Sequence, residues 1–201
     1  MKIAILGGAF NPPHLGHSII ARQVLEFTDI SQVWLAPCWR HTFQKELAPS
    51  QHRLSMTQFL ANGHVSVSDI EIKNQLPGDT IETLELAEKL APGDQFSFII
   101  GSDNLVSFKK WTSWEDLITR WKFWIFPRPG FDYHLEQYGL ENPKYKFQLI
   151  QHPLLATSDI SSTLIRNRLK AGYPIDYLLP EKVREYINKH KLYTLKFKEE
   201  K

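Results

Sequence analysis

The feature that most constrains the fold is a regular alternation of two kinds of segment. Short runs rich in β-branched and aromatic residues alternate with longer segments that carry apolar residues every three or four positions. The strand-like runs are residues 2–6, 32–36, 65–67, 95–100, 122–126 and 146–150, and the main helix-like segments are residues 17–27, 52–61, 79–90, 114–119, 161–170 and 181–190. This order predicts an α/β fold: a Rossmann-like, doubly wound parallel sheet with helices on both faces and a small helical extension near the carboxyl end.

The length of the chain limits the number of domains. Its 201 residues suffice for one well-buried core and are few for two. We therefore expect a single domain over residues 1–195 and a charged, frayed tail over residues 196–201. Within the domain, Asp79 and Glu82 have the spacing of a capping box, which predicts a helix start there.

Charge and cysteine content narrow the classes of ligand and the cellular compartments that suit this chain. A formal charge of +2 does not predict a nucleic-acid partner, whereas small phosphorylated ligands remain compatible with it. Cys38 is the only cysteine, so no intramolecular disulfide or cysteine-based zinc site can form. Neither a signal peptide nor an apolar run of membrane-spanning length is recognisable. We expect a cytoplasmic protein without a membrane partner.

The most informative stretch joins the first strand to the first helix and reads Gly-Gly-Ala-Phe-Asn-Pro-Pro-His-Leu-Gly-His, residues 7–17. Glycines there let the backbone approach a phosphate, and a helix start offers free amides to it. His14 and His17 are three residues apart and are expected to point to the same side, with Gly16 keeping the space open. The spacing fits neither a Walker loop nor the dinucleotide fingerprint. A plain turn would explain the glycines alone, but the whole string favours a phosphate site.

A second phosphate-binding pattern lies near the carboxyl end. Residues 158–166 read Ser-Asp-Ile-Ser-Ser-Thr-Leu-Ile-Arg, so small hydroxyl side chains precede Arg166 by about one helical turn. Amides, hydroxyls and a guanidinium together can grip a phosphate. Taken alone, the pattern would fit a serine-capped helix with an ordinary surface arginine equally well.

Together the two patterns resemble a known family. The first is similar to the G-G-x-F-[DN]-P-x-H-x-G-H signature of HIGH-type nucleotidyltransferases, and more closely that of bacterial nicotinate-nucleotide adenylyltransferases. The second resembles the Ile-Ser-Ser-Thr-x-Ile-Arg element of the same family, and the resemblance spans nearly all of residues 1–195. It implies that the catalytic residues are His14, His17 and Arg166. It also implies an ATP site formed by Gly8, Ala9, Phe10, His14, His17, Gly101, Asp103, Ile160, Ser161, Ser162, Thr163 and Arg166.

The middle of the chain resembles the acceptor region of that family. Asp103 follows a predicted strand and could accept hydrogen bonds from ribose hydroxyls, and Trp111 could stack on a pyridine ring, whereas Trp114 is expected to pack inward. The acceptor residues implied by the resemblance are Asn11, Lys45, Thr83, Asp103 and Trp111. His41 and Arg53 stay open between substrate contact and the surface. The tryptophan-rich residues 111–124 fit either a homo-oligomer surface or the core.

Ala9 and Asn11 depart from the commonest sequence of the first motif in that family, where threonine and aspartate are frequent at these positions.

The resemblance implies adenylyl transfer from ATP to nicotinate mononucleotide in NAD biosynthesis, with magnesium (Mg²⁺) held by the substrates and no metal site of the protein's own. Three alternatives remain: a nicotinamide-mononucleotide adenylyltransferase, a phosphopantetheine adenylyltransferase, or a non-catalytic nucleotide-binding regulator.

Overall fold

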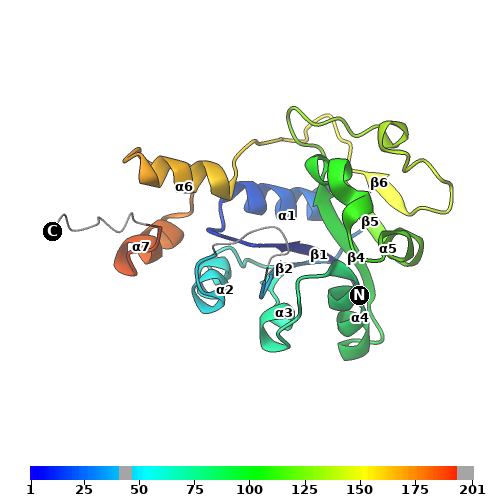
Figure 1. The fold of residues 1–201 in the computed structure, drawn as a ribbon, viewed down its shortest axis with the longest axis horizontal. Helices are drawn as coiled ribbons and strands as arrows, with labels where there is room; N and C mark the ends of the chain where they lie inside the picture. Colours follow the sequence, from blue (N-terminus) through cyan, green and yellow to red (C-terminus); the bar gives the residue numbers. More distant parts are fainter. Residues whose placement is uncertain (41–46, 194–201) are drawn as a thin grey trace.

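The computed structural model describes residues 1–40 and 47–193 and contains a six-stranded sheet (Figure 1). Every pairing is parallel, and the strand order is β3-β2-β1-β4-β5-β6. The strands are β1 (Lys2–Gly8), β2 (Gln32–Pro37), β3 (Val65–Val67), β4 (Gln95–Gly101), β5 (Lys122–Phe126) and β6 (Phe147–Leu149). The predicted strands are therefore confirmed, within two residues at each boundary.

Helices cover both faces of this sheet. The α-helices are α1 (Leu15–Phe27), α2 (Ser50–Gln58), α3 (Ile70–Lys73), α4 (Thr80–Leu90), α5 (Trp114–Arg120), α6 (Ser162–Lys170) and α7 (Glu181–Lys189), and the 3₁₀ helices are η1 (Ser102–Lys110) and η2 (Leu135–Tyr138). In the view of Figure 1, α1 lies above the sheet and α3 and α4 lie below it. The Rossmann-like α/β prediction is confirmed. None of the described helices is long and apolar enough to cross a membrane.

The alternation of side chains along β1 separates the core into two apolar clusters. Ala4 and Leu6 join a cluster that includes residues of α1, α2, α6 and α7. Ile3 and Ile5 join the opposite cluster, with residues of α4, α5 and η1. Because β1 is buried on both faces and paired on both edges, the turn that follows it starts from a fixed position.

Two expectations about local structure are settled here. The predicted helix start is confirmed, because Asp79 is the N-cap residue of α4. The expected capping bond is absent: Asp79 Oδ1 accepts from the Thr112 hydroxyl at 3.0 Å instead. The tryptophan-rich stretch belongs largely to the core, because Trp121 and Trp124 are each only 3% exposed.

Candidate active site

The candidate site lies outside the carboxyl ends of the central strands. Strand β1 is flanked by β2 on one side and β4 on the other, so the sheet reverses its winding direction there, and such switch points are where open α/β sheets bind ligands. The turn from β1 to α1 contains the predicted motif. Gly16 within it is tightly enclosed, since a Cβ atom there would lie 2.9 Å from His14 Nδ1 and 3.3 Å from the Ile160 carbonyl oxygen.

His14 and His17 lie side by side, as expected, with ring centroids 3.7 Å apart. His14 occupies the N-cap of α1, and its backbone N–H donates to Nδ1 of His17 at 3.1 Å. A neutral His17 that accepts at Nδ1 carries its proton on Nε2. His14 is 6% exposed, and its Nδ1 has no hydrogen-bond partner among the described residues. Because His14 Nδ1 is enclosed by the protein next to Gly16, any ligand contact by this pair would involve the other ring atoms.

Both imidazoles are neutral at pH 7. Burial lowers the pKa of His17 to about 3, and the nearby Arg128 charge acts in the same direction. Burial, followed by His17 and Arg128, holds the pKa of His14 far below its usual value. The two rings can act as neutral N–H donors to phosphate oxygens.

The amino end of α6 meets this turn from the other end of the sequence. The Ser162 hydroxyl donates to the Pro12 carbonyl oxygen at 2.7 Å, and Ser161 caps the helix by accepting from the Leu164 N–H at 3.2 Å. The Arg166 guanidinium donates to the Asn11 carbonyl oxygen at 2.7 Å and to the Thr163 hydroxyl at 3.1 Å. The two predicted phosphate elements are thus one structural unit.

A cavity of about 360 Å³ lies between these elements. It contains most of the predicted ATP-site residues, namely Ala9, Phe10, His14, His17, Asp103, Ile160, Ser161, Ser162 and Thr163. Gly8, Gly101 and Arg166 do not line it, although Arg166 is bonded to Thr163 at its edge. We call this space the histidine cavity.

Arg128 is a residue of the histidine cavity that the sequence analysis missed. It follows β5, and its Nη1 lies 2.9 Å from Asp103 Oδ2, with both side chains roughly three-quarters buried. Ser158 was also missed as a lining residue. Arg128 follows β5 and Ser158 precedes α6, both at the carboxyl edge of the sheet. Asp103 was predicted from its position just after a strand at that edge, so the same reasoning could have identified Arg128.

A second cavity, of about 200 Å³, lies on the other side of the β1 turn. Gly7 and Gly8 line it, whereas the next residue, Ala9, lines the histidine cavity. Trp111 lines it too, with its ring stacked on Phe108 at a centroid distance of 5.0 Å. The remaining lining residues are Cys38, Arg40, Glu71, Gly78, Asp79, Thr80, Phe98, Asn104, Ser107, Lys110 and Thr112. We call this space the tryptophan cavity.

The predicted acceptor residues do not all reach that cavity. Thr83 is fully buried beneath it, and its neighbour Thr80 lines the wall instead. Asn11 is 1% exposed, and its Oδ1 accepts from the Ala48 N–H at 3.1 Å and from the Tyr193 hydroxyl at 2.9 Å. Neither Thr83 nor Asn11 lines the tryptophan cavity, and their roles as acceptor residues stay predictions. Asp103 lines the histidine cavity, and Lys45 and His41 lie outside the described residues.

Arg53 is not a surface residue, and it lines neither cavity. It is 1% exposed, and three of its nitrogens donate to backbone carbonyl oxygens: Nε to Ala48 at 2.9 Å, Nη1 to Ala9 at 2.8 Å and Nη2 to Trp39 at 3.1 Å. The surface interpretation is therefore wrong. The guanidinium joins the β1 turn to the segments that follow β2.

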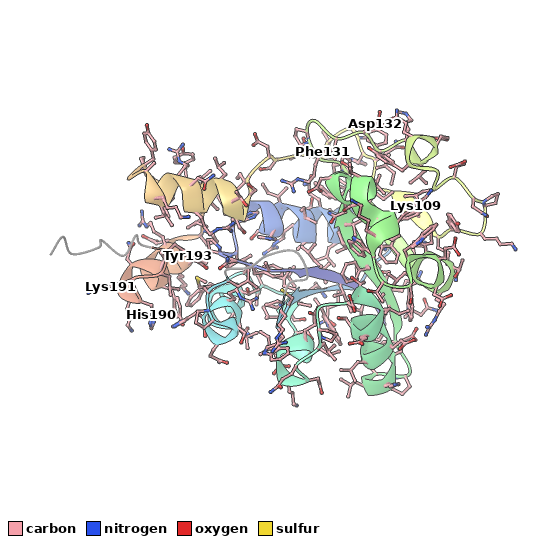
Figure 2. All side chains as sticks on the ribbon, viewed as in Figure 1. Lys109, Phe131, Asp132, His190, Lys191 and Tyr193 are labelled. Atoms are coloured by element: carbon pink, nitrogen blue, oxygen red, sulfur yellow. The ribbon has the colours of Figure 1, made fainter. Side chains whose placement is uncertain are left out.

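Tyr193, which follows α7 (Figure 2), supports the same turn through Asn11. We expect Tyr193→Phe to lower the free energy of unfolding by about 1 kcal/mol, because one buried hydrogen bond is lost. Urea denaturation measures the change. The matched control is Tyr173→Phe on a side chain that is 61% exposed, which should leave stability unchanged. Equal effects of the two substitutions would show that the bond to Asn11 contributes nothing.

Comparison with known proteins agrees with this architecture. The cytidylyltransferase-like family model matches residues 5–168. The probable nicotinate-nucleotide adenylyltransferase of Bacillus pumilus is 34% identical, covering 96% of this chain and 98% of its own, and the nicotinate-nucleotide adenylyltransferase of Bacillus subtilis is 32% identical over similar shares. The structure of Plasmodium falciparum nicotinic acid mononucleotide adenylyltransferase complexed with NaAD superposes with a TM-score of 0.80 at 26% identity, covering 96% of this chain and 97% of that one.

The parallel sheet, with paired histidines and a hydroxyl-lined helix start at its carboxyl edge, defines a nucleotidyltransferase with a cytidylyltransferase-like domain. Within that class, the chain belongs to the nicotinate-nucleotide adenylyltransferase family. The resemblance inferred from the two motifs is confirmed.

Proposed function

We propose that this protein transfers the adenylyl group of ATP to nicotinate mononucleotide, forming nicotinate adenine dinucleotide and pyrophosphate. The observation that carries the proposal is the pair of cavities on either side of the β1 turn: one has phosphate donors and the other has an aromatic wall. The relatives named above are adenylyltransferases of the same acceptor class, and a second structure of the Plasmodium falciparum enzyme is a complex with APC.

In this proposal ATP occupies the histidine cavity. The N–H groups of His14 and His17 contact its phosphates, and the hydroxyls of Ser161, Ser162 and Thr163 contact them from the α6 side. Arg166 adds positive charge beside Thr163. The Asp103 carboxylate accepts from ribose hydroxyls, because its two oxygens have lone pairs beyond those used by Arg128.

The reaction then needs no covalent intermediate on the protein. An oxygen of the acceptor phosphate attacks the α-phosphorus of ATP in line, and the bond from that phosphorus to the bridging oxygen breaks, so pyrophosphate leaves with the electron pair. The residues named above position the triphosphate and stabilise the charge that develops on the leaving group.

We propose that magnesium participates as an ion held by the phosphates of ATP. Over residues 1–40 and 47–193, no group of three or more His, Cys, Asp or Glu side chains is arranged to hold a metal ion. The protein's own groups therefore fit a substrate-held ion better than a protein-bound one. When bound, the ion would neutralise phosphate charge. We also propose a cytoplasmic location, because the lone Cys38 suits a reducing compartment.

The test is magnesium-dependent pyrophosphate release from ATP by the purified protein, with three acceptors supplied separately. We expect nicotinate mononucleotide to be used best, nicotinamide mononucleotide less well, and 4′-phosphopantetheine not at all. A preference for 4′-phosphopantetheine would contradict the acceptor assignment, and no release with any of them would favour a nucleotide-binding regulator.

A further inference from the structure

Two aromatic residues with left-handed backbone meet at Asn11, one from each end of the sequence. Phe10, which precedes Asn11 in the β1 turn, has a φ of 47°, and Tyr193, which follows α7, has a φ of 62°. Bulky residues rarely adopt this conformation, and it persists only where surrounding contacts hold it. Backbone strain of this kind gathers at functional sites, so the contacts that maintain it are candidates for a role in the reaction.

Asn11 accepts hydrogen bonds from three separate segments. Its Oδ1 accepts from the Ala48 N–H at 3.1 Å and from the Tyr193 hydroxyl at 2.9 Å. Its backbone carbonyl oxygen accepts from the Arg166 guanidinium at 2.7 Å. Asn11 is almost fully buried, so water has little room to replace a donor that is lost. The Tyr193 hydroxyl and the Arg166 guanidinium are therefore linked through a single residue.

Tyr193 remains a hydrogen-bond donor near neutral pH. Burial raises the pKa of its hydroxyl, and the positive charges of Arg166 and Arg53 oppose that rise only in part. The ring packs against the apolar cluster that contains residues of α1, α2, α6 and α7. Both the position of the hydroxyl and its proton are thus maintained by the fold.

Arg166 connects this contact to the histidine cavity. The guanidinium that donates to Asn11 also donates to the Thr163 hydroxyl at 3.1 Å, and Thr163 lines the cavity. A free arginine side chain has many rotamers, and acceptors at both ends of its fork restrict them. Fixing the Asn11 carbonyl therefore fixes where the charge of Arg166 lies relative to the cavity.

We propose that Tyr193 is a positioning residue for the reaction, which through Asn11 holds Arg166 where its guanidinium stabilises charge on the departing pyrophosphate. Tyr193 itself lines neither the histidine cavity nor the tryptophan cavity. The inference rests on the proposed function, since the role of Arg166 is taken from it. A tyrosine with a purely structural role would affect stability alone, whereas a positioning tyrosine also affects the turnover of the folded protein.

The experiment compares Tyr193→Phe with Tyr138→Phe, which removes a similar partly buried hydrogen bond elsewhere. The Tyr138 hydroxyl donates to the Asp132 carbonyl oxygen at 3.1 Å, and Figure 2 shows Asp132 and Tyr193 well apart. Phenylalanine keeps the ring in each case, so both variants are expected to fold. Steady-state pyrophosphate release at saturating nicotinate mononucleotide gives kcat and the KM for ATP, and urea denaturation gives the folded fraction.

We expect Tyr193→Phe to lower kcat by about tenfold and to leave the KM for ATP within about twofold of the wild-type value. The split arises because Arg166 acts on charge that develops only as pyrophosphate leaves, so ground-state binding of ATP changes little. Tyr138→Phe should leave both constants unchanged, although its stability falls by a similar amount.

A second comparison shows whether the effect passes through Arg166. Arg166→Lys keeps a positive charge but lacks the fork that joins Asn11 to Thr163. In that background Tyr193→Phe should lower kcat by less than about twofold, because the link through which it acts is already broken.

An unchanged kcat in Tyr193→Phe overturns the inference, and so does an equal loss of kcat in Tyr138→Phe, since a structural role would explain both. An undiminished loss in the Arg166→Lys background overturns it too, because Tyr193 would then act by another route. If the wild-type protein releases no pyrophosphate with any acceptor, the proposed function itself has failed, an outcome distinct from turnover that does not depend on Tyr193.

Discussion

Replacing His17 with alanine is expected to lower kcat by about 100-fold to 1,000-fold, the usual effect of removing one donor that stabilises transition-state charge. The ring lies in the histidine cavity beside His14, and its Nδ1 accepts from the His14 N–H, which leaves the Nε2 proton for a phosphate oxygen. The free energy of unfolding should fall by only about 1 kcal/mol, since one hydrogen bond at a helix start is lost. Steady-state pyrophosphate release and urea denaturation measure the two effects.

Two further variants make this result specific to the donor. Glutamine places its amide nitrogen near the position of Nε2, so His17→Gln should recover part of the lost turnover. His64→Ala changes an exposed histidine and should leave both turnover and stability intact. Suppose that His17→Ala lowered the free energy of unfolding by as much as it raised the activation free energy of the reaction. The ring would then be a packing residue, and its catalytic assignment would be wrong.

The largest expected effect on stability is that of Arg53→Ala, which should lower the free energy of unfolding by about 3 kcal/mol or more. The guanidinium is almost fully buried, and its removal leaves the carbonyl oxygens of Ala9, Ala48 and Trp39 without this donor. Arg53→Lys keeps the charge but cannot reproduce the forked geometry, so an intermediate loss is expected. Chemical denaturation at a single pH measures both.

Arg22→Ala, on an exposed arginine of α1, is the matched control and should change stability by less than about 0.5 kcal/mol. An Arg53→Ala protein as stable as this control would show that the three carbonyl contacts contribute little. In that case the shape of the β1 turn would have to be maintained by Asn11 and its partners.

The sequence was informative wherever the signal was local. Buried parallel strands such as β4 and β5 appear as continuous apolar runs, so their positions could be read directly. The short α3 and the 3₁₀ segment η1 gave no such signal, because few residues in each face the core. The placement of His14, His17 and Ser161 around one cavity was predictable because each belongs to a motif at a junction between a strand or loop and a helix.

Long-range contacts explain the remaining errors. Nothing local distinguishes a buried Arg53 from a surface arginine, since its burial depends on carbonyl groups of segments before and after β2. The bonds from Ala48 and Tyr193 to the Asn11 amide oxygen likewise come from distant segments, so the motif alone gave no sign of them. Glu71 was missed as a lining residue of the tryptophan cavity because that cavity is assembled from five or more separate stretches of sequence.

The hydrogen bonds from α6 to the β1 turn also determine when the histidine cavity can form during synthesis of the chain on the ribosome. Ser162 and Arg166 reach Pro12 and Asn11 across about 150 residues of sequence. A ribosome releases the first strand and its turn early, yet one wall of the histidine cavity is still missing until α6 has emerged. Nascent chains that stop before α6 would therefore carry the histidine motif without the α6 wall of the proposed triphosphate site, so under that proposal nucleotide does not stabilise the early intermediates of folding there.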